Sequence, residues 1–315
     1  MNLLPILNLK IKMKNIYLIV FLLFVTQIFA HPFFEDDCDA CGCSTSGGSL
    51  GFSSLLNKNF VGLRYFYQQY TSKDGLYNDS PWIKENFNTV QLWTKFAVSE
   101  KFQVSAIVPF QFHSNEKTLG TQSISGIGDI SVVGFYTLIN KISEDVVWAQ
   151  NLEIGSGFKA PTGKYNSMMN GTVNPSFQVG TGSWDFLLLA EYTLIHESLG
   201  WNSSISYNIK TENKDHYQFG NQFNYNSVIF YNTKIDEIAL VPQLGISGEV
   251  FQTNKQFDEA LKDSKGDALF GKIGLEIGFK KFSLGFNGML PISQNLTGGK
   301  VKSDYRFSLH LNYKL

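Results

Sequence analysis

The last fifteen residues, Val301–Leu315 (VKSDYRFSLHLNYKL), alternate between apolar and polar side chains. One parity is mostly apolar and holds Val301, Tyr305, Phe307, Leu309, Leu311, Tyr313 and Leu315. The other parity is polar or charged and holds Lys302, Asp304, Arg306, Ser308, His310, Asn312 and Lys314. Because successive side chains of a strand point to opposite faces, this stretch predicts a strand with one apolar and one polar face.

This predicted strand is longer than the usual strand of a soluble protein. At about 3.3 Å per residue it would extend roughly 45 Å, which is enough for a tilted crossing of a bilayer. We therefore expect Val301–Leu315 to be the closing strand of a transmembrane β-barrel. A soluble β-sandwich is the alternative, but it predicts strands of only about 5–7 residues and more closely spaced turns.

The same alternation recurs from Asn59 onward and predicts twelve strands: 59–71, 86–98, 101–114, 126–139, 145–159, 183–195, 200–211, 215–231, 236–251, 267–279, 281–291 and 301–315. Short connections follow the even strands, and all but one of the connections after the odd strands are longer. This asymmetry is typical of outer-membrane barrels with both termini on the short-turn side. The predicted fold is therefore all-β, an antiparallel up-and-down transmembrane β-barrel of about 12 strands.

The composition agrees with an exported barrel. The 26 basic and 27 acidic residues leave no basic excess for nucleic acid, and a mean hydropathy of −0.09 argues against a helical membrane protein. Residues 1–30 resemble a signal peptide, with three lysines before the apolar run 16–29 and Ala30 at the expected cut. An uncleaved anchor helix is the alternative. The expected location is the bacterial outer membrane, with lipid as one partner.

The predicted organisation has three parts. They are the signal peptide 1–30, a Cys/Gly/Ser-rich periplasmic N-terminal segment 31–58 that is a candidate plug, and the barrel 59–315. Within the barrel, the polar parity should line the lumen and the solute path. Its ionisable members are Arg64, Lys95, Asp129, Glu153, Lys159, Glu191, Lys272, Glu276, Asp304 and Arg306. Since unpaired charges away from bulk water are costly, these five acids and five bases should pair.

The segment after the signal peptide holds all three cysteines, Cys38, Cys41 and Cys43. Thiolates at this spacing can converge on a soft ion such as copper or zinc, and His31 would add an imidazole. As an alternative, two of the cysteines form a disulfide and the third is left for a periplasmic partner. A third interpretation is that the cysteines are chemically inert.

Four short motifs occur in an order that resembles one family. They are Val108-Pro109-Phe110, Gly126-Ile127-Gly128-Asp129, Phe158-Lys159-Ala160-Pro161-Thr162-Gly163-Lys164 and Gly180-Thr181-Gly182-Ser183-Trp184-Asp185. Together they resemble the outer-membrane proteins of the "MetA-pathway of phenol degradation" family. The resemblance covers nearly the whole of 59–315. It implies a barrel that passes small, often apolar or aromatic compounds, and it brings no catalytic residues.

The Cys-rich head departs from the plain family pattern. It resembles the N-terminal segments of Bacteroidetes-type relatives that handle copper.

The functional expectation is passive passage of a small solute, either an apolar or aromatic compound or a metal, through a constricted lumen. A twelve-strand barrel is narrow and partly filled by side chains, so we expect a restricted path rather than a wide pore. Two alternatives stay open: a barrel that anchors the copper-binding head, and an outer-membrane lipid hydrolase. We do not expect the chain to be an enzyme, because no Ser-His-acid arrangement is recognisable in the sequence.

Overall fold

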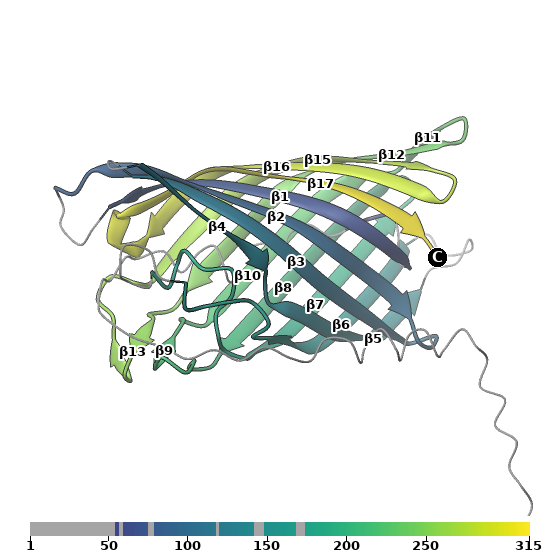
Figure 1. The fold of residues 1–315 in the computed structure, drawn as a ribbon. Coiled ribbons are helices and arrows are strands. Elements are labelled where there is room, and N and C mark those ends of the chain that lie inside the picture. Colours follow the sequence, from purple (N-terminus) through teal and green to yellow (C-terminus); the bar gives the residue numbers. More distant parts are fainter. Residues whose placement is uncertain (1–53, 57–58, 75–78, 118–119, 142–147, 168–173) are drawn as a thin grey trace, which may run out of the picture. The chain divides into compact units, whose positions relative to one another are not determined.

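The computed structural model describes residues 54–56, 59–74, 79–117, 120–141, 148–167 and 174–315, all within one compact unit, Glu35–Leu315. These residues form a closed antiparallel barrel of twelve strands, as predicted (Figure 1). Around the ring the strands are β1 (Phe60–Lys73), β2 (Trp82–Ala97), β3 (Phe102–Lys117), β5 (Ile130–Lys141), β6 (Trp148–Ala160), β7 (Asp185–His196), β8 (Leu199–Lys210), β10 (Gln222–Tyr231), β12 (Ile238–Phe251), β15 (Gly266–Phe279), β16 (Phe282–Leu296) and β17 (Val301–Lys314). The pairing of β17 with β1 closes the ring.

The remaining elements lie at the strand ends. They are β4 (Gly120–Ile127), which pairs with β3, β11 (Thr233–Ile235), which pairs with β12, a small loop sheet of β9 (Tyr217–Gln218), β13 (Lys255–Gln256) and β14 (Glu259–Ala260), and the 3-10 turn η1 (Thr297–Gly299). In the described residues no helix has the length and apolarity needed to cross a membrane.

Several predicted boundaries need correction. The strand predicted at 126–139 is two elements, because β4 begins at Gly120 and the chain breaks at Gly128-Asp129 before β5. The strand predicted at 215–231 also divides, into β9 in the loop sheet and β10 in the wall. Much of the predicted loop 292–300 is strand, since β16 continues to Leu296.

One stretch of the wall lacks strand pairing on one side. Strand β3 pairs with β4 in its C-terminal half and with β5 in its N-terminal half, whereas only β5 goes on to pair with β6. Beyond Ile130 and Ala160, where the last β5–β6 partners lie, β4 has no second partner strand among the described residues. We call this unpaired side of β4 the seam.

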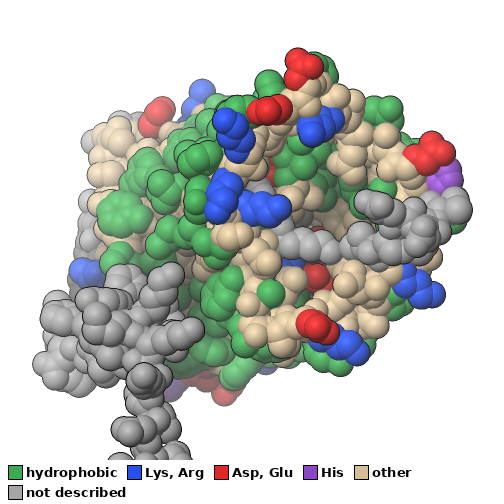
Figure 2. Space-filling model, turned by 90° about the vertical axis from the view of Figure 1, so that its right-hand side faces the viewer, with side chains coloured by type: hydrophobic (Ala, Val, Ile, Leu, Met, Phe, Trp, Pro, Cys, Tyr) green, Lys and Arg blue, Asp and Glu red, His purple; other side chains and the backbone are tan. Residues whose placement is uncertain are grey.

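The alternation of exposure confirms the sidedness expected for most strands. In β1 the even residues from Phe60 to Ser72 are buried inside, while odd residues such as Leu63 face outward. Viewed from the end that carries the short turns, hydrophobic side chains cover much of the outer wall, and charged side chains gather at a rim around a central hollow (Figure 2). The apolar face thus meets lipid and the polar face meets the lumen.

The closing strand departs from its predicted parity at one end. The register between β1 and β17 shifts between Gln69 and Tyr70, so β17 has a bulge at Asp304. Because a bulge inserts one unpaired residue, it reverses the faces of the residues before it. Val301, expected to meet lipid, is therefore buried in the lumen. Asp304, expected in the lumen, accepts a hydrogen bond from Thr71 on the outward face of β1, 2.8 Å away.

Candidate functional site

The long-loop half of the lumen holds an apolar cluster, which is unusual for the inside of a barrel with a polar lining. We call the five rings at its centre the aromatic cluster: Phe66, Tyr70, Phe87, Phe177 and Phe270. Seven further buried side chains pack with them: Ile124, Val179, Phe251, Ala268, Met289, Leu296 and Val301. All but two of the twelve come from inward-facing strand positions, so alternation in the sequence places an apolar surface inside the barrel as well as outside.

A buried ion pair borders the aromatic cluster. The Arg306 guanidinium contacts both carboxylate oxygens of Glu249, at 2.6 and 3.1 Å, and donates to the Tyr70 hydroxyl at 2.7 Å. It also stacks over Phe270, 4.1 Å from the ring centroid. Since Glu249 is on β12 and Arg306 on β17, the pair bridges two intervening strands inside the lumen. A two-point contact of this kind fixes geometry as well as charge.

Phe177 is the one aromatic cluster member that comes from a loop. It is fully buried and lies 5.9 Å from the Phe87 ring and 6.4 Å from the His113 ring. Its backbone N–H donates to the Asn174 carbonyl at 3.2 Å. The next residue, Gln178, accepts from the Ser167 N–H and donates to the Ser167 carbonyl, both at 3.0 Å. The two described legs of this loop, 161–167 and 174–184, therefore contact each other, and Phe177 packs inside the lumen.

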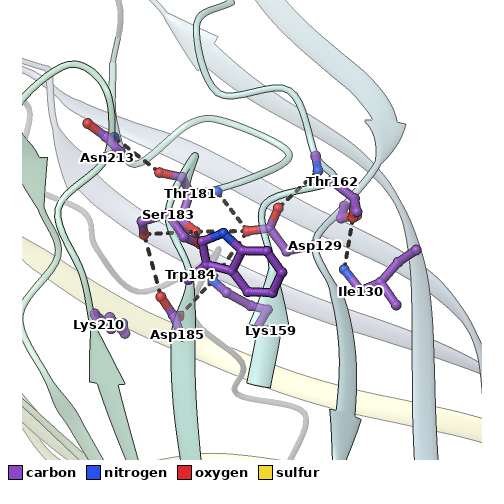
Figure 3. Close-up of polar contacts among 12 residues, drawn as sticks. Asp129, Ile130, Lys159, Thr162, Thr181, Ser183, Trp184, Asp185, Lys210 and Asn213 are labelled. Carbon is purple, nitrogen blue, oxygen red and sulfur yellow. Dashed lines mark hydrogen bonds and ion pairs between the residues drawn. The ribbon is translucent and has the colours of Figure 1, made fainter. Parts of the chain in front are cut away.

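Asp129, at the break between β4 and β5, holds both legs of this loop (Figure 3). One carboxylate oxygen accepts from the Gly163 N–H at 2.9 Å, and the other accepts from the Thr181 N–H and hydroxyl, both at 2.8 Å. The two legs cross so closely that a Cβ on Gly180 would lie 2.5 Å from the Gly163 carbonyl oxygen. We call Asp129, Lys159, Thr181 and Asp185 the clasp.

Lys159 completes the clasp. Its ammonium lies 2.8 Å from Asp185, 3.3 Å from Asp129 and 2.9 Å from the Thr181 hydroxyl. A cation between two carboxylates offsets part of the cost of burying all three charges. Beside the clasp, the Thr162 hydroxyl donates to the Gly128 carbonyl at 2.8 Å and accepts from the Ile130 N–H at 3.0 Å, as Figure 3 shows in part. These bonds tie the start of the loop to the edge of the wall at the seam.

The loop also packs against β4. A Cβ built on Gly126, which shares the inward face of β4 with Ile124, would lie 3.5 Å from the Val179 side chain, so Val179 packs on the inner face of β4. Tyr165, on the first leg, packs edge-on against Phe219, and burial raises the pKa of its phenol above the ordinary value. The phenol therefore stays neutral and packs against Phe219 as an apolar side chain.

The short-turn half of the lumen receives the described end of the N-terminal segment. Glu276 accepts hydrogen bonds from the Ser54 hydroxyl at 2.6 Å and from the Leu55 and Leu56 N–H groups at 2.8 and 3.3 Å. His310 lies 3.6 Å from the same carboxylate. A His–acid pair therefore exists in the lumen. Two serine hydroxyls beside it, those of Ser54 and Ser283, donate to Glu276 at 2.6 and 3.1 Å.

The predicted lumen residues pair less often with one another than expected. Two of the expected acid–base pairs form, Lys95 with Glu153 at 2.7 Å and Lys159 with Asp129 at 3.3 Å. The others contact neutral groups or unpredicted acids: Arg64 bonds Gln91, Glu191 accepts from Asn202, Lys272 donates to Asn226, Glu276 faces His310, and Arg306 pairs with Glu249. Asp304 faces outward, as described above.

Sequence reasoning missed several residues of the site. Asp185 closes a motif quoted for the family resemblance, and Glu249 lies at an inward position of a correctly predicted strand, so charge and parity could have found both. Phe177 carried no signal, because it lies in an irregular loop. The predicted metal ligands His31, Cys38, Cys41 and Cys43 lie outside the described residues. Within the described residues, no group of three or more His, Cys, Asp and Glu side chains could hold a metal ion.

Among the solved structures that match, the first named here shares the fold of this chain. The COG4313 outer membrane channel from Pseudomonas putida F1 is 15% identical, with a TM-score of 0.62, and the match covers 83% of this chain and 99% of that one. The beta domain of the Bordetella autotransporter BrkA is 7% identical, with a TM-score of 0.48 over 82% and 100% of the two chains. The CymD monoaromatic hydrocarbon channel is 8% identical, with a TM-score of 0.39 over 82% and 90%.

No protein of curated function matches the chain significantly. A family model described as "Putative MetA-pathway of phenol degradation" matches residues 82–299, from the first residue of β2 to η1. This range includes the clasp, Phe177 and the seam, and it confirms the family expected from the four motifs. The chain belongs to this family, and it is a twelve-stranded barrel of the outer-membrane type.

Proposed function

We propose that the chain mediates passive passage of a small apolar solute, such as a single-ring aromatic compound, through the outer membrane. The observation that carries this proposal is the aromatic cluster inside the lumen. A barrel that passes polar solutes has a polar, water-filled interior. Here the long-loop half of the interior presents rings and aliphatic side chains, a surface that attracts apolar solutes by the hydrophobic effect.

In this proposal Phe177 blocks the path, and passage requires the leg 174–184 to move. Phe177 and Val179 are both on this leg, and both pack in the apolar cluster inside the lumen. Displacing the leg would clear the lumen beside β4. An apolar solute could then leave sideways into the bilayer as well as along the lumen. The clasp sets how much free energy that displacement costs.

The N-terminal segment is the second element proposed to restrict the path. Ser54, Leu55 and Leu56 donate hydrogen bonds to Glu276 inside the lumen, and these contacts support the proposal. Removing residues 31–53 should therefore raise ion conductance through the reconstituted barrel. Unchanged conductance would exclude a plug role for 31–58.

Uptake by intact cells tests the main proposal. Cells of a host with a low-permeability outer membrane would express the full chain, and accumulation of labelled toluene and L-arabinose would be followed at limiting external concentration. We expect toluene uptake to rise several-fold over cells without the chain, with arabinose unchanged, because a sugar has no partner in the aromatic cluster. Toluene uptake equal to that of cells without the chain would refute the proposal.

The soft-metal site stays a separate proposal that rests on the Cys38-x-x-Cys41-x-Cys43 spacing alone. Titration of the purified chain with Cu(I) under reducing conditions should give a stoichiometric complex. The variant with all three cysteines changed to serine should lose it. Absence of binding by the unmodified chain would leave the disulfide and inert interpretations.

A further inference from the structure

Three lysines and a tryptophan gather on the outside of the wall where β17, β1 and β2 meet the long loops. Thr71, an outward residue of β1, is opposite Lys302 of β17 on one side and Lys84 of β2 on the other. Lys73, the next outward residue of β1, is opposite Trp82. These ends lie side by side at the end of the barrel away from the C-terminus (Figure 1). We call this surface the lysine patch: Lys73, Trp82, Lys84 and Lys302.

Two lysines of the patch share one aromatic ring. The Lys73 ammonium lies 4.6 Å and the Lys302 ammonium 4.8 Å from the centroid of the Trp82 ring, which is 43% exposed. Lys73 also donates to the Ser80 carbonyl at 2.8 Å. Among the residues that the structure describes, no acid forms an ion pair with a lysine of the patch. Like charges gathered in this way attract an anion from outside the protein.

The acids near the lysine patch do not neutralise it. Asp74 pairs with Lys117 at 3.0 Å. Asp304 lies one outward row closer to the short turns, and Glu116 is on β3, at the side of the patch. Asp79 is exposed in the turn before β2. The patch therefore keeps the positive charge that an anionic group would recognise.

The next outward rows, toward the short turns, carry neutral polar groups. The Tyr67 hydroxyl donates to the Asn86 amide oxygen at 2.7 Å, and the Tyr65 hydroxyl donates to the Asn88 amide oxygen at 2.6 Å. The Gln69 amide nitrogen donates to the same Asn86 oxygen at 3.1 Å. Fixed amides and hydroxyls offer both donors and acceptors, which the hydroxyl groups of a sugar need. We call these rows the polar rows: Tyr65, Tyr67, Gln69, Asn86 and Asn88.

Both surfaces lie at the depth of lipid headgroups. The apolar band of an outer-membrane barrel is about 25 Å tall, which a strand tilted by about 40° crosses in roughly ten residues. The outward apolar residues of β1 begin at Val61, so the band ends near Thr71. The polar rows thus lie at its upper edge and the lysine patch above it. Since long loops face the outside of the cell, these headgroups are those of the outer leaflet.

Polarity at this depth is not a property of the whole wall. On β12, which also ends in a long loop, the exposed outward residues Leu244, Ile246 and Val250 are apolar up to the end of the strand. The polar rows and the lysine patch therefore mark one side of the barrel, and that side is suited to a specific neighbour rather than to acyl chains alone.

We propose that the lysine patch and the polar rows bind the phosphorylated sugar headgroup of a glycolipid in the outer leaflet, such as lipid A. The lysines would contact the phosphate, and the Trp82 ring and the polar rows would contact the sugar. The acyl chains would lie on the apolar wall below, over exposed residues such as Leu63 and Val90. A phospholipid offers the phosphate but no sugar for the polar rows. This inference does not depend on the solute that the barrel passes.

Native mass spectrometry of the full chain in detergent tests this site. The probes are lipid A, lipid A from which the phosphates have been removed, and phosphatidylglycerol, and the fraction of chain with one bound lipid is measured for each. We expect lipid A to bind about tenfold more tightly than the other two. In the double variant Lys73→Gln and Lys302→Gln, the affinity for lipid A should fall about tenfold, because two ammonium groups that attract the headgroup are lost.

A matched control separates this site from general charge effects. Lys280 and Lys281, in the short turn between β15 and β16, also stack on aromatic rings, those of Phe279 and Tyr313 at 4.9 and 5.4 Å. The double variant Lys280→Gln and Lys281→Gln makes the same change in charge and in ring contacts, but at the opposite end of the barrel. It should bind lipid A as tightly as the unmodified chain.

Three results would overturn the inference. The first is lipid A binding that is equal in the unmodified chain and the Lys73/Lys302 variant, or that falls equally in both double variants. The second is binding of lipid A no tighter than that of phosphatidylglycerol. The third is a dimer of the chain that dissociates in the Lys73/Lys302 variant and carries no lipid A, which would make this face an interface between two copies.

Discussion

The two halves of this lumen differ in the chemistry of their buried groups. In the long-loop half, two clusters of charged side chains are paired: Arg306 with Glu249 and Tyr70, and Lys159 with Asp129, Asp185 and Thr181. In the short-turn half, the amides of Asn287 and Asn312 and the hydroxyl of Ser308 have no hydrogen-bond partner among the described residues. A paired charge cluster specifies one geometry, whereas a neutral group without a partner does not.

This difference in buried groups suggests that the two halves of the lumen have different functions. The long-loop half combines an apolar surface with a loop fixed by charge, so it suits selection of apolar solutes and control of access. The short-turn half opens into a central hollow at its end (Figure 2), where a solute on its way through would pass. Changing one member in each half should therefore have effects of different size and kind.

The largest effect is expected from the buried ion pair. Changing Glu249 to Gln removes the charge that faces Arg306 and leaves a buried guanidinium without compensation, which should lower the free energy of unfolding by about 3–5 kcal/mol. Unfolding midpoints in lipid vesicles would measure it. Glu237→Gln, on the exposed β11–β12 turn, is the matched control. Replacing both partners, with Arg306→Met and Glu249→Leu, should recover most of the lost free energy of unfolding. Equal midpoints for the two Glu→Gln variants would contradict this account.

The clasp should give a smaller and local effect. Asp129→Asn keeps the shape of the side chain but weakens three hydrogen bonds and the contact with Lys159, at a cost of about 1.5–3 kcal/mol to the docked loop. Because the barrel strands are untouched, we expect faster trypsin cleavage after Lys164 with little change in the unfolding midpoint. Asp236→Asn, in the turn between β11 and β12, supplies the control. Cleavage at the unmodified rate would show that the loop is held by other contacts.

The wall was predictable from the sequence and the loop was not. Alternation over 301–315 and eleven similar stretches is a local signal, because side-chain direction in a strand depends only on position parity. The same rule failed at Asp304, where a bulge shifts parity without any change in local composition. It also missed the extension of β16 to Leu296 through a stretch predicted as loop.

The candidate site was predictable in part. Parity placed Asp129, Lys159 and Arg306 inside the lumen, but it could not say which charges meet, since Arg306 and Glu249 are 57 residues apart. Phe177 reaches the aromatic cluster only because Asp129 fixes a loop that has no periodicity of its own.

Removing the ring of Phe177 should change passage more than stability. Phe177→Ala leaves a ring-sized gap that weakens the docking of its loop. Because Phe177 is outside the barrel strands, we expect toluene uptake to rise several-fold while the barrel unfolds at nearly the same midpoint. Phe257→Ala is the control, since Phe257 is 58% exposed in another loop. Slower uptake in Phe177→Ala would show that the ring binds the solute rather than blocks it.

The smallest effect on stability is expected within the short-turn half, where two serines differ only in their partners. The Ser283 hydroxyl donates to Glu276 at 3.1 Å, whereas the Ser308 hydroxyl has no partner. A hydrogen bond to a charged group contributes about 1.5–3 kcal/mol, so Ser283→Ala should destabilise the barrel by about that amount. Ser308→Ala removes an unsatisfied group and should change the free energy of unfolding by less than about 0.5 kcal/mol. If Ser308→Ala costs as much as Ser283→Ala, the Ser308 hydroxyl has a structural partner, and the contrast between the two halves of the lumen is lost at this position.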